Sequence, residues 1–248
     1  MNQKTIGLYG DSFVEVWDKD KKKNKDKNHL SLKTWPNLIA EKFDLDIVHS
    51  GQGGTSYWDI PLQQFSLNDI PDILIFCWTS SARLYNKEAM QLHPDPSKSW
   101  FNKEVSSNIK EQLINASQQY FKYLHDEKKE ILEYQSCLFH FDETILSKIP
   151  SDRKIIHLWS FGHNTTNYHP NNIAYLHNWK HGLEIRPCCM SIALMDGCSI
   201  DDADPFENHL NTQGKHNLIV DFISHSLVTY DTNTLNDYSD NVMKKITS

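Results

Sequence analysis

The chain has 248 residues, of which 39% are hydrophobic and 23% are charged, and its formal net charge is -7. This length suits one sizeable α/β domain, and the acidic balance argues against a nucleic-acid partner, which usually selects a basic surface. No apolar run approaches the ~20 residues of a membrane span, and the polar start Met1-Asn2-Gln3-Lys4 predicts no signal peptide, so we expect a cytoplasmic protein with no membrane partner.

The first predicted strand ends on a Gly-Asp-Ser turn. Ile6, Leu8 and Tyr9 form a short apolar run, and Gly10 permits a sharp turn before a helix. Ligands of open α/β sheets bind outside the carboxyl ends of the strands, so Ser12 stands where chemistry is expected. The tripeptide is also an ordinary turn composition, and a plain strand-to-helix turn is the alternative.

The next segments predict a loop, a helix and a second strand. The six lysines between residues 18 and 28 are diluted by three aspartates, which favours a solvated loop over a basic arm for an anionic partner. Apolar spacing predicts a helix over 32–43 and a strand over 45–48. The glycine-rich turn 49–56 then indicates a close backbone approach, and it lacks the Gly-Lys-Ser/Thr of a phosphate loop.

The clearest strand is the continuous apolar run 72–78, which ends in Thr79-Ser80-Ser81-Ala82-Arg83. A proline-bearing loop is expected over 84–100, as a candidate lid. Further along, the spacing predicts one long or broken helix over 103–136, a shorter helix over 138–148, a strand over 154–159 and a helical turn or two over 172–181. An apolar segment of open type covers 185–195, a closing helix follows His209, and residues 231–248 form a polar tail after a single domain over 1–230. The alternation of strands and helices predicts a parallel sheet covered on both faces.

Three of these motifs together resemble the SGNH (GDSL-type) hydrolase family. They are Gly10-Asp11-Ser12, the glycine-rich second turn, and His209-Leu210-Asn211-x-x-Gly214 before the last helix. The resemblance implies an α/β fold of flavodoxin-like three-layer α/β/α type with a central parallel sheet. It also implies hydrolysis of a small-molecule or glycan ester, with no metal or organic cofactor.

The resemblance assigns roles to individual residues. Ser12 is the nucleophile, His209 is the general base, and the backbone N–H groups of Ser12 and Gly51 bind the oxyanion. His49 stands where the family has Asn. The family's acidic residue lies three positions before the histidine, where this chain has Phe206, so Glu207 and Asp204 are the candidates to orient His209, and Glu207 is preferred because it is closer.

The third motif departs from the family pattern. The segment from Trp78 to Arg83 replaces Gly-x-Asn-Asp, whose Asn donates the third oxyanion hydrogen bond, and it looks like a variant that we associate loosely with phage-encoded members. Loss of one such donor costs about 3 kcal/mol of transition-state stabilisation. Either Thr79, Ser80 or Arg83 substitutes for the Asn, or the chain is a slow or inactive relative. Two hypotheses therefore stand. The first is a serine esterase, for which an O-acetyl group on a carbohydrate is one candidate substrate, and the second is a binding or structural module on the same fold. Acyl transfer by the same residues is a weaker third.

Three other features have alternative interpretations. His177 and His181 are spaced to ligate zinc from one helical face, with His163 or His169 as a third ligand, although surface or packing roles are commoner. The chain has five cysteines, which we expect to be reduced and mostly buried, with a reactive pair at Cys188-Cys189 as the alternative. Trp17, Trp58, Trp78 and Trp100 lie near the predicted site and could stack on a sugar. Sequence does not define the oligomeric state.

Overall fold

The computed structural model describes residues 3–16, 33–81, 83–86, 89–92, 95, 99–101, 104–160, 177–185, 188–193, 210 and 213–231. The central feature is a sheet of five strands in the order β2-β1-β3-β7-β8, in which every neighbouring pair is parallel. The strands are β1 (Lys4–Gly10), β2 (Leu45–His49), β3 (Ile73–Trp78), β7 (Lys154–Trp159) and β8 (Leu183–Glu184). Counted within this sheet the order is 2-1-3-4-5, the arrangement of flavodoxin-like doubly wound folds.

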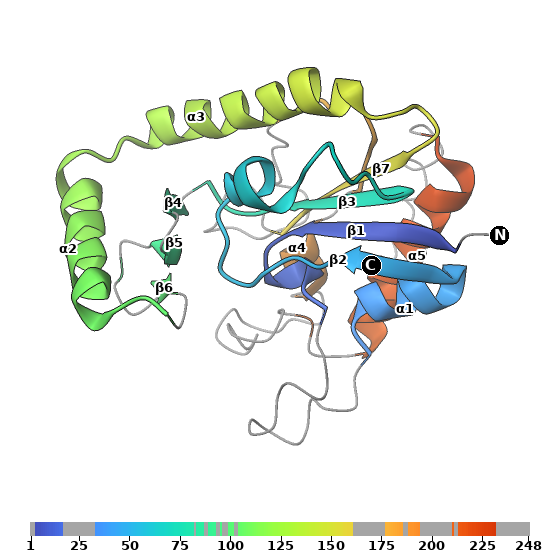
Figure 1. Cartoon of the computed structure of the whole chain (residues 1–248), viewed down its shortest axis with the longest axis horizontal. Coiled ribbons are helices and arrows are strands. Elements are labelled where there is room, and N and C mark those ends of the chain that lie inside the picture. Colours follow the sequence, from blue (N-terminus) through green and yellow to red (C-terminus); the bar gives the residue numbers. More distant parts are fainter. Residues whose placement is uncertain are drawn as a thin grey trace, which may run out of the picture.

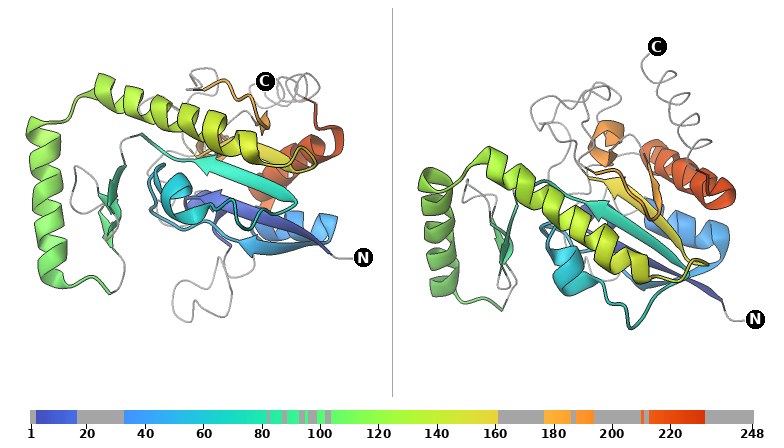
Figure 2. Two further views of the ribbon diagram at one scale, coloured as in Figure 1. Left: turned by 45° about the horizontal axis from the view of Figure 1, so that its top comes forward. Right: turned by 90° about the horizontal axis from the view of Figure 1, so that it is seen from above.

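Helices cover both faces of the sheet, so the predicted α/β class with a covered parallel sheet is confirmed (Figures 1 and 2). Helix α1 (Trp35–Phe43) packs against α5 (Gln213–Thr229) on one face. Helix α3 (Glu127–His140) crosses the other face, continues into a π-helical turn at Phe141–Ile145, and ends in a 3-10 turn at Leu146–Lys148. The separate helix expected over 138–148 is therefore the tail of α3.

The core explains why these strands form the centre. All six residues of β3 are buried, as expected of a central parallel strand. On the α3 side, Phe76 and Trp78 meet Phe141 edge to face at centroid distances of 5.0 and 5.3 Å. Aromatic packing of this kind fixes the position of α3 over the carboxyl half of β3.

A second, smaller layer lies beyond the carboxyl ends of the central strands. It consists of α2 (Ser107–Tyr123) and a three-stranded sheet of order β4-β5-β6, formed by Leu84–Asn86, Ala89–Leu92 and Trp100–Phe101 (Figure 1). The prediction of a loop over 84–100 was therefore wrong for the residues that form these strands. Its first two strands pair as an antiparallel hairpin, a pattern that the polar residues and two prolines of the segment concealed.

The helix expected over 103–136 is broken, which was one of the two forms predicted. Helix α2 ends at Tyr123, and α3 starts after Asp126, whose carboxylate accepts a hydrogen bond from the Lys129 N–H at 2.9 Å. Such an N-cap satisfies a backbone donor that the helix itself leaves unpaired. The apolar spacing continues through the break, which is why it did not reveal two helices.

The structure also bears on three other predictions. The segment expected to be apolar over 185–195 contains α4 (Cys189–Ala193). The lysine-rich segment 18–28 and the tail after Asp231 lie outside the described residues. Among the helices that are described, none is long and apolar enough to cross a membrane.

Candidate active site

The Gly-Asp-Ser turn lies at the carboxyl end of β1, beside β3. Gly10 has a φ of 138°, and a Cβ on it would lie 2.3 Å from the Cys77 carbonyl oxygen. Only glycine fits this position, because any side chain would meet both a strained backbone and the neighbouring strand. The chain then enters a short 3-10 turn at Ser12–Val14, and Ser12 is half-buried.

The side chain of Asp11 holds this turn in place. Asp11 is fully buried, and its carboxylate accepts hydrogen bonds from the Phe13 N–H at 3.1 Å, from Ser160 Oγ at 2.8 Å and from Arg83 Nη1 at 3.3 Å. These donors come from three separate parts of the chain. Since buried carboxylates need such partners, Asp11 joins the ends of β1, β3 and β7.

The glycine-rich loop after β2 packs directly on the Ser12 turn. A Cβ on Gly51 would lie 2.8 Å from the Gly10 carbonyl oxygen and 3.0 Å from that of Asp11, and a Cβ on Gly53 would lie 3.5 Å from the Ser12 Cβ. The Gln52 N–H donates to the Gly10 carbonyl oxygen at 3.0 Å. The structure therefore brings Gly51 and Ser12 together, as the resemblance requires.

Two backbone donors in this turn remain available. Within the described ranges, neither the Ser12 N–H nor the Gly51 N–H donates a hydrogen bond, whereas their neighbours Phe13, Gln52 and Gly53 all do. Unpaired N–H groups beside a half-buried hydroxyl are what an oxyanion site requires.

The three residues considered as the third oxyanion donor differ in placement. Arg83 is tied to Asp11, and its Nη1 also donates to the Thr55 carbonyl oxygen at 3.0 Å. The Thr79 hydroxyl is buried without a hydrogen-bond partner among the described residues. Ser80, the next residue, is half-buried. Of the three side chains, that of Thr79 is buried, and those of Ser80 and Arg83 are partly exposed.

The predicted base and its acidic partners lie outside the described residues: His209, Glu207 and Asp204. The described chain resumes with the buried Leu210 and then with α5 from Gln213. Sequence analysis missed two residues that hold the turn, Ser160 and Gln64. Gln64 Oε1 accepts from the Gly10 N–H at 2.6 Å and its Nε2 donates to the Gly10 carbonyl oxygen at 3.0 Å. A small polar residue at the end of a strand was the available signal for Ser160, while nothing local marks Gln64.

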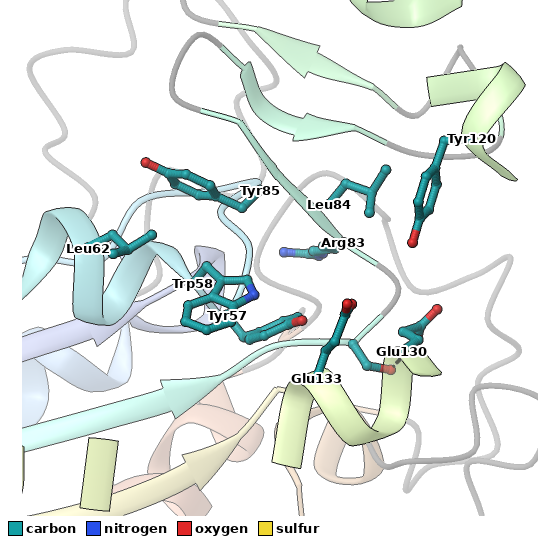
Figure 3. Close-up of a pocket in the computed structure, with 10 residues that line it drawn as sticks. Tyr57, Trp58, Leu62, Arg83, Leu84, Tyr85, Tyr120, Glu130 and Glu133 are labelled. Carbon is teal, nitrogen blue, oxygen red and sulfur yellow. Dashed lines mark hydrogen bonds between the residues drawn. The ribbon is translucent and has the colours of Figure 1, made fainter. Parts of the chain in front are cut away.

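A pocket of about 420 Å³ has in its wall Arg83, the residue that contacts Asp11 of the Ser12 turn (Figure 3). Its other walls come from the segment that holds Tyr57 and Trp58, from β4, and from the facing ends of α2 and α3. Of the four tryptophans singled out by sequence, Trp58 lines this pocket and Trp78 is fully buried in the core. The side chains of Trp17 and Trp100 are outside the described part of the structure.

The histidine pair 177 and 181 does not form the helical zinc face considered as an alternative, because the chain from 177 to 181 is not helical. Both side chains instead contact the buried Asp142, His177 through Nε2 and His181 through Nδ1, each at 2.9 Å. Burial acts to raise the pKa of Asp142, but hydrogen bonds from His177, the Lys180 N–H and His181 outweigh it and lower the pKa. Among the described residues, no group of three or more His, Cys, Asp and Glu could hold a metal ion.

The described cysteines are free and buried, as expected: Cys77, Cys137, Cys188 and Cys189. Cys77 Sγ lies 3.2 Å from Ser160 Oγ, behind the Asp11 carboxylate. Burial raises the pKa of the Cys77 thiol well above its ordinary value, so it is a packing group and a poor nucleophile.

Together these features define a doubly wound α/β protein with a half-buried serine at the switch point of the sheet. The strand order reverses between β1 and β3, and ligands of such folds bind in the crevice outside the strand ends at that point. Comparisons of the chain with protein-family models, with curated proteins and with solved structures give no match. The function must therefore be argued from the site itself.

Proposed function

We propose that the chain is a serine hydrolase of the SGNH type that cleaves an ester through an acyl-enzyme. The observation that carries this proposal is the position of Ser12, half-buried at the switch point, beside two backbone N–H groups that have no partner in the described structure. An O-acetyl group on a carbohydrate is the ester that family analogy suggests.

The proposed reaction has two steps. Ser12 Oγ attacks the ester carbonyl carbon and passes its proton to His209, while the Ser12 and Gly51 N–H groups bind the oxyanion. Collapse of the tetrahedral intermediate expels the alcohol, which takes the proton from His209. A water molecule, deprotonated by the same imidazole, then attacks the acyl-enzyme and releases the acid and the free serine.

The third oxyanion donor in this proposal is Ser80. Arg83 is held by Asp11 and Thr55, and the buried Thr79 hydroxyl cannot reach a substrate without a rearrangement. Ser80 follows β3 directly, at the sheet edge that carries the Ser12 turn. A hydroxyl at this point replaces the amide that the family uses.

The test is covalent labelling with a fluorophosphonate, which reacts with activated serines. We expect one adduct on the parent protein, located at Ser12 by peptide mapping, and none on the Ser12→Ala and His209→Ala variants. Ser136→Ala is the matched control, because Ser136 is an exposed residue of α3, and it should label like the parent. A folded parent that takes up no label, or labelling that survives Ser12→Ala, would rule out this mechanism.

The second hypothesis, a binding module on a hydrolase scaffold, is favoured by one observation. Arg83, which lies within the altered third motif, is committed to the buried Asp11 and is not available at the oxyanion position. If the labelling experiment fails on folded protein, this second function becomes the better interpretation.

A further inference from the structure

The pocket beside Arg83 is unusually rich in aromatic side chains. Four of its lining residues are aromatic, and they come from three separate regions of the sequence: Tyr57, Trp58, Tyr85 and Tyr120. Figure 3 shows Tyr85 and Tyr120 on opposite sides, with Trp58 and Tyr57 beside each other below them in this view. Aromatic rings offer a flat apolar face together with a polar edge, and they suit ligands that have both.

The polar groups of the pocket are of both signs. Glu130 and Glu133 project from α3, and Arg83 lies across from them (Figure 3). Glu130 is positioned by Ser81 Oγ at 2.5 Å and by His125 Nε2 at 2.6 Å. Glu133 is about half exposed, with Lys129 Nζ 3.4 Å away. The two carboxylates are thus acceptors in the wall of the pocket.

This composition excludes several ligand classes. Only Leu62 and Leu84 are aliphatic, so the pocket is a poor site for a long acyl chain. Two carboxylates disfavour phosphates and acidic ligands, because Arg83 is already paired with Asp11. A single metal ion would fill little of a volume of about 420 Å³, which lies in the range of sites for organic ligands. A neutral polyol fits, since its hydroxyls can donate to the two carboxylates and its apolar ring face can stack on the aromatic side chains.

We propose that this pocket binds the neutral saccharide part of a glycan ester, with aromatic stacking on the ring and hydrogen bonds from its hydroxyls to Glu130 and Glu133. The proposal rests on the proposed function and names the alcohol side of its ester. It gives a purpose to α2, α3 and β4, which supply half of the residues that line the pocket.

Arg83 links the pocket to the reactive turn. Its guanidinium lines the pocket, and the same Nη1 atom contacts Asp11, the neighbour of Ser12, and the Thr55 carbonyl oxygen in the glycine-rich loop. A saccharide in the pocket would therefore lie next to the Ser12 turn. In this proposal the ester group extends from the pocket past Arg83 toward Ser12, which is not itself a lining residue.

The experiment measures saccharide binding without turnover. The full chain carrying Ser12→Ala is applied to an array of neutral, amino and acidic saccharides, each with and without O-acetyl groups. Glu133→Gln and Tyr85→Ala are added in the same background, with Glu111→Gln as the control, because Glu111 is an exposed carboxylate of α2 that does not line the pocket. We expect the Ser12→Ala protein to retain neutral saccharides. Each pocket variant should bind them about tenfold or more weakly, and the control should bind them as tightly as the Ser12→Ala protein does.

Retention of no saccharide, retention of acidic or cationic ligands only, or equal binding by the pocket variants and the control would overturn this proposal. Thermal melting of each variant shows that it is folded, and Glu133→Gln changes only an exposed side chain. Hydrolysis of 4-nitrophenyl acetate by the parent is measured in parallel. Hydrolysis without saccharide binding rejects only the pocket assignment, whereas saccharide binding without hydrolysis or fluorophosphonate labelling rejects only the serine mechanism.

Discussion

The replacement of Asp11 by Asn tests whether the buried ion pair holds the Ser12 turn. Asp11 is fully buried and the Arg83 side chain is 13% exposed, so the pair is largely removed from water. In Asp11→Asn, the oxygen that accepts from Phe13 and Ser160 is retained, but an amide N–H₂ group can now face Arg83 Nη1 across the 3.3 Å contact. Burial already lowers the pKa of Arg83, and Asp11 is the largest group acting against that shift, so the guanidinium loses its main compensating charge.

The expected cost follows from the loss of one partner of a buried pair. Such losses destabilise proteins by about 3–5 kcal/mol, and the residual exposure of Arg83 favours the lower end, about 3 kcal/mol. With a urea dependence of about 3 kcal/mol per molar, the midpoint of unfolding should fall by about 1 M. Glu41→Gln is the control, since its pair with Lys33 is 50% and 58% exposed and should contribute less than about 1 kcal/mol.

A double-mutant cycle completes this test. Arg83→Met removes the charge that Asp11→Asn leaves unpaired, so the double variant should be more stable than the sum of the single losses by about 1 kcal/mol or more. Urea unfolding followed by tryptophan fluorescence measures all four proteins. An Asp11→Asn variant within about 0.5 kcal/mol of the parent, or strictly additive losses in the cycle, would refute the role assigned to this pair.

Three further predictions concern other parts of the structure. Gly10→Ala should destabilise the protein by about 3 kcal/mol or more, measured by thermal unfolding, because a Cβ would lie 2.3 Å from the Cys77 carbonyl oxygen at a φ of 138°; Gly53→Ala, whose Cβ would meet only Glu15 Oε2 at 3.0 Å and the Ser12 Cβ at 3.5 Å, should cost less. Burial lowers the pKa of His157 to about 3. As the pH falls from about 6.5 to about 3, the unfolded chain therefore takes up a proton that the folded chain does not, and the free energy of unfolding should fall by up to about 1.4 kcal/mol per pH unit. Urea midpoints measured across this range should depend less on pH in His157→Gln. Ser80→Ala should lower kcat for 4-nitrophenyl acetate about 100-fold or more, whereas Thr79→Val should leave kcat unchanged and stability equal or higher, because the buried Thr79 hydroxyl has no partner among the described residues; the opposite ranking would transfer the third oxyanion donor to Thr79.

The parallel sheet could be predicted because its signals are local. The apolar runs that predicted β1, β3 and β7 are continuous, and in the structure these strands pair side by side along the centre of the sheet. The order of the strands is not a local property, but short connections and the right-handed crossover rule leave few alternatives for a chain of this kind. The α/β class was therefore within reach of sequence alone.

The three-stranded sheet beyond the strand ends could not be predicted, since its stability depends on tertiary contacts. The strands β4, β5 and β6 are two to four residues long, and such short segments carry little periodicity. The break between α2 and α3 depends on one capping carboxylate, that of Asp126, within a run of polar residues that could equally continue a helix. Packing roles were favoured for the histidines 177 and 181, but their partner Asp142 could not be named, because it is distant in sequence.

The altered third motif and the additional layer are connected through Arg83. In the resembled family, this motif supplies an Asn to the oxyanion, whereas here the segment after β3 sends Ser81 to Glu130 of α3 and Arg83 to Asp11. The two contacts tie the segment after β3 to α3 and to the Ser12 turn, and both residues line the pocket. On this argument, substrate binding and the geometry at Ser12 are coupled through a single side chain, and an Arg83→Met variant should weaken both saccharide retention and fluorophosphonate labelling.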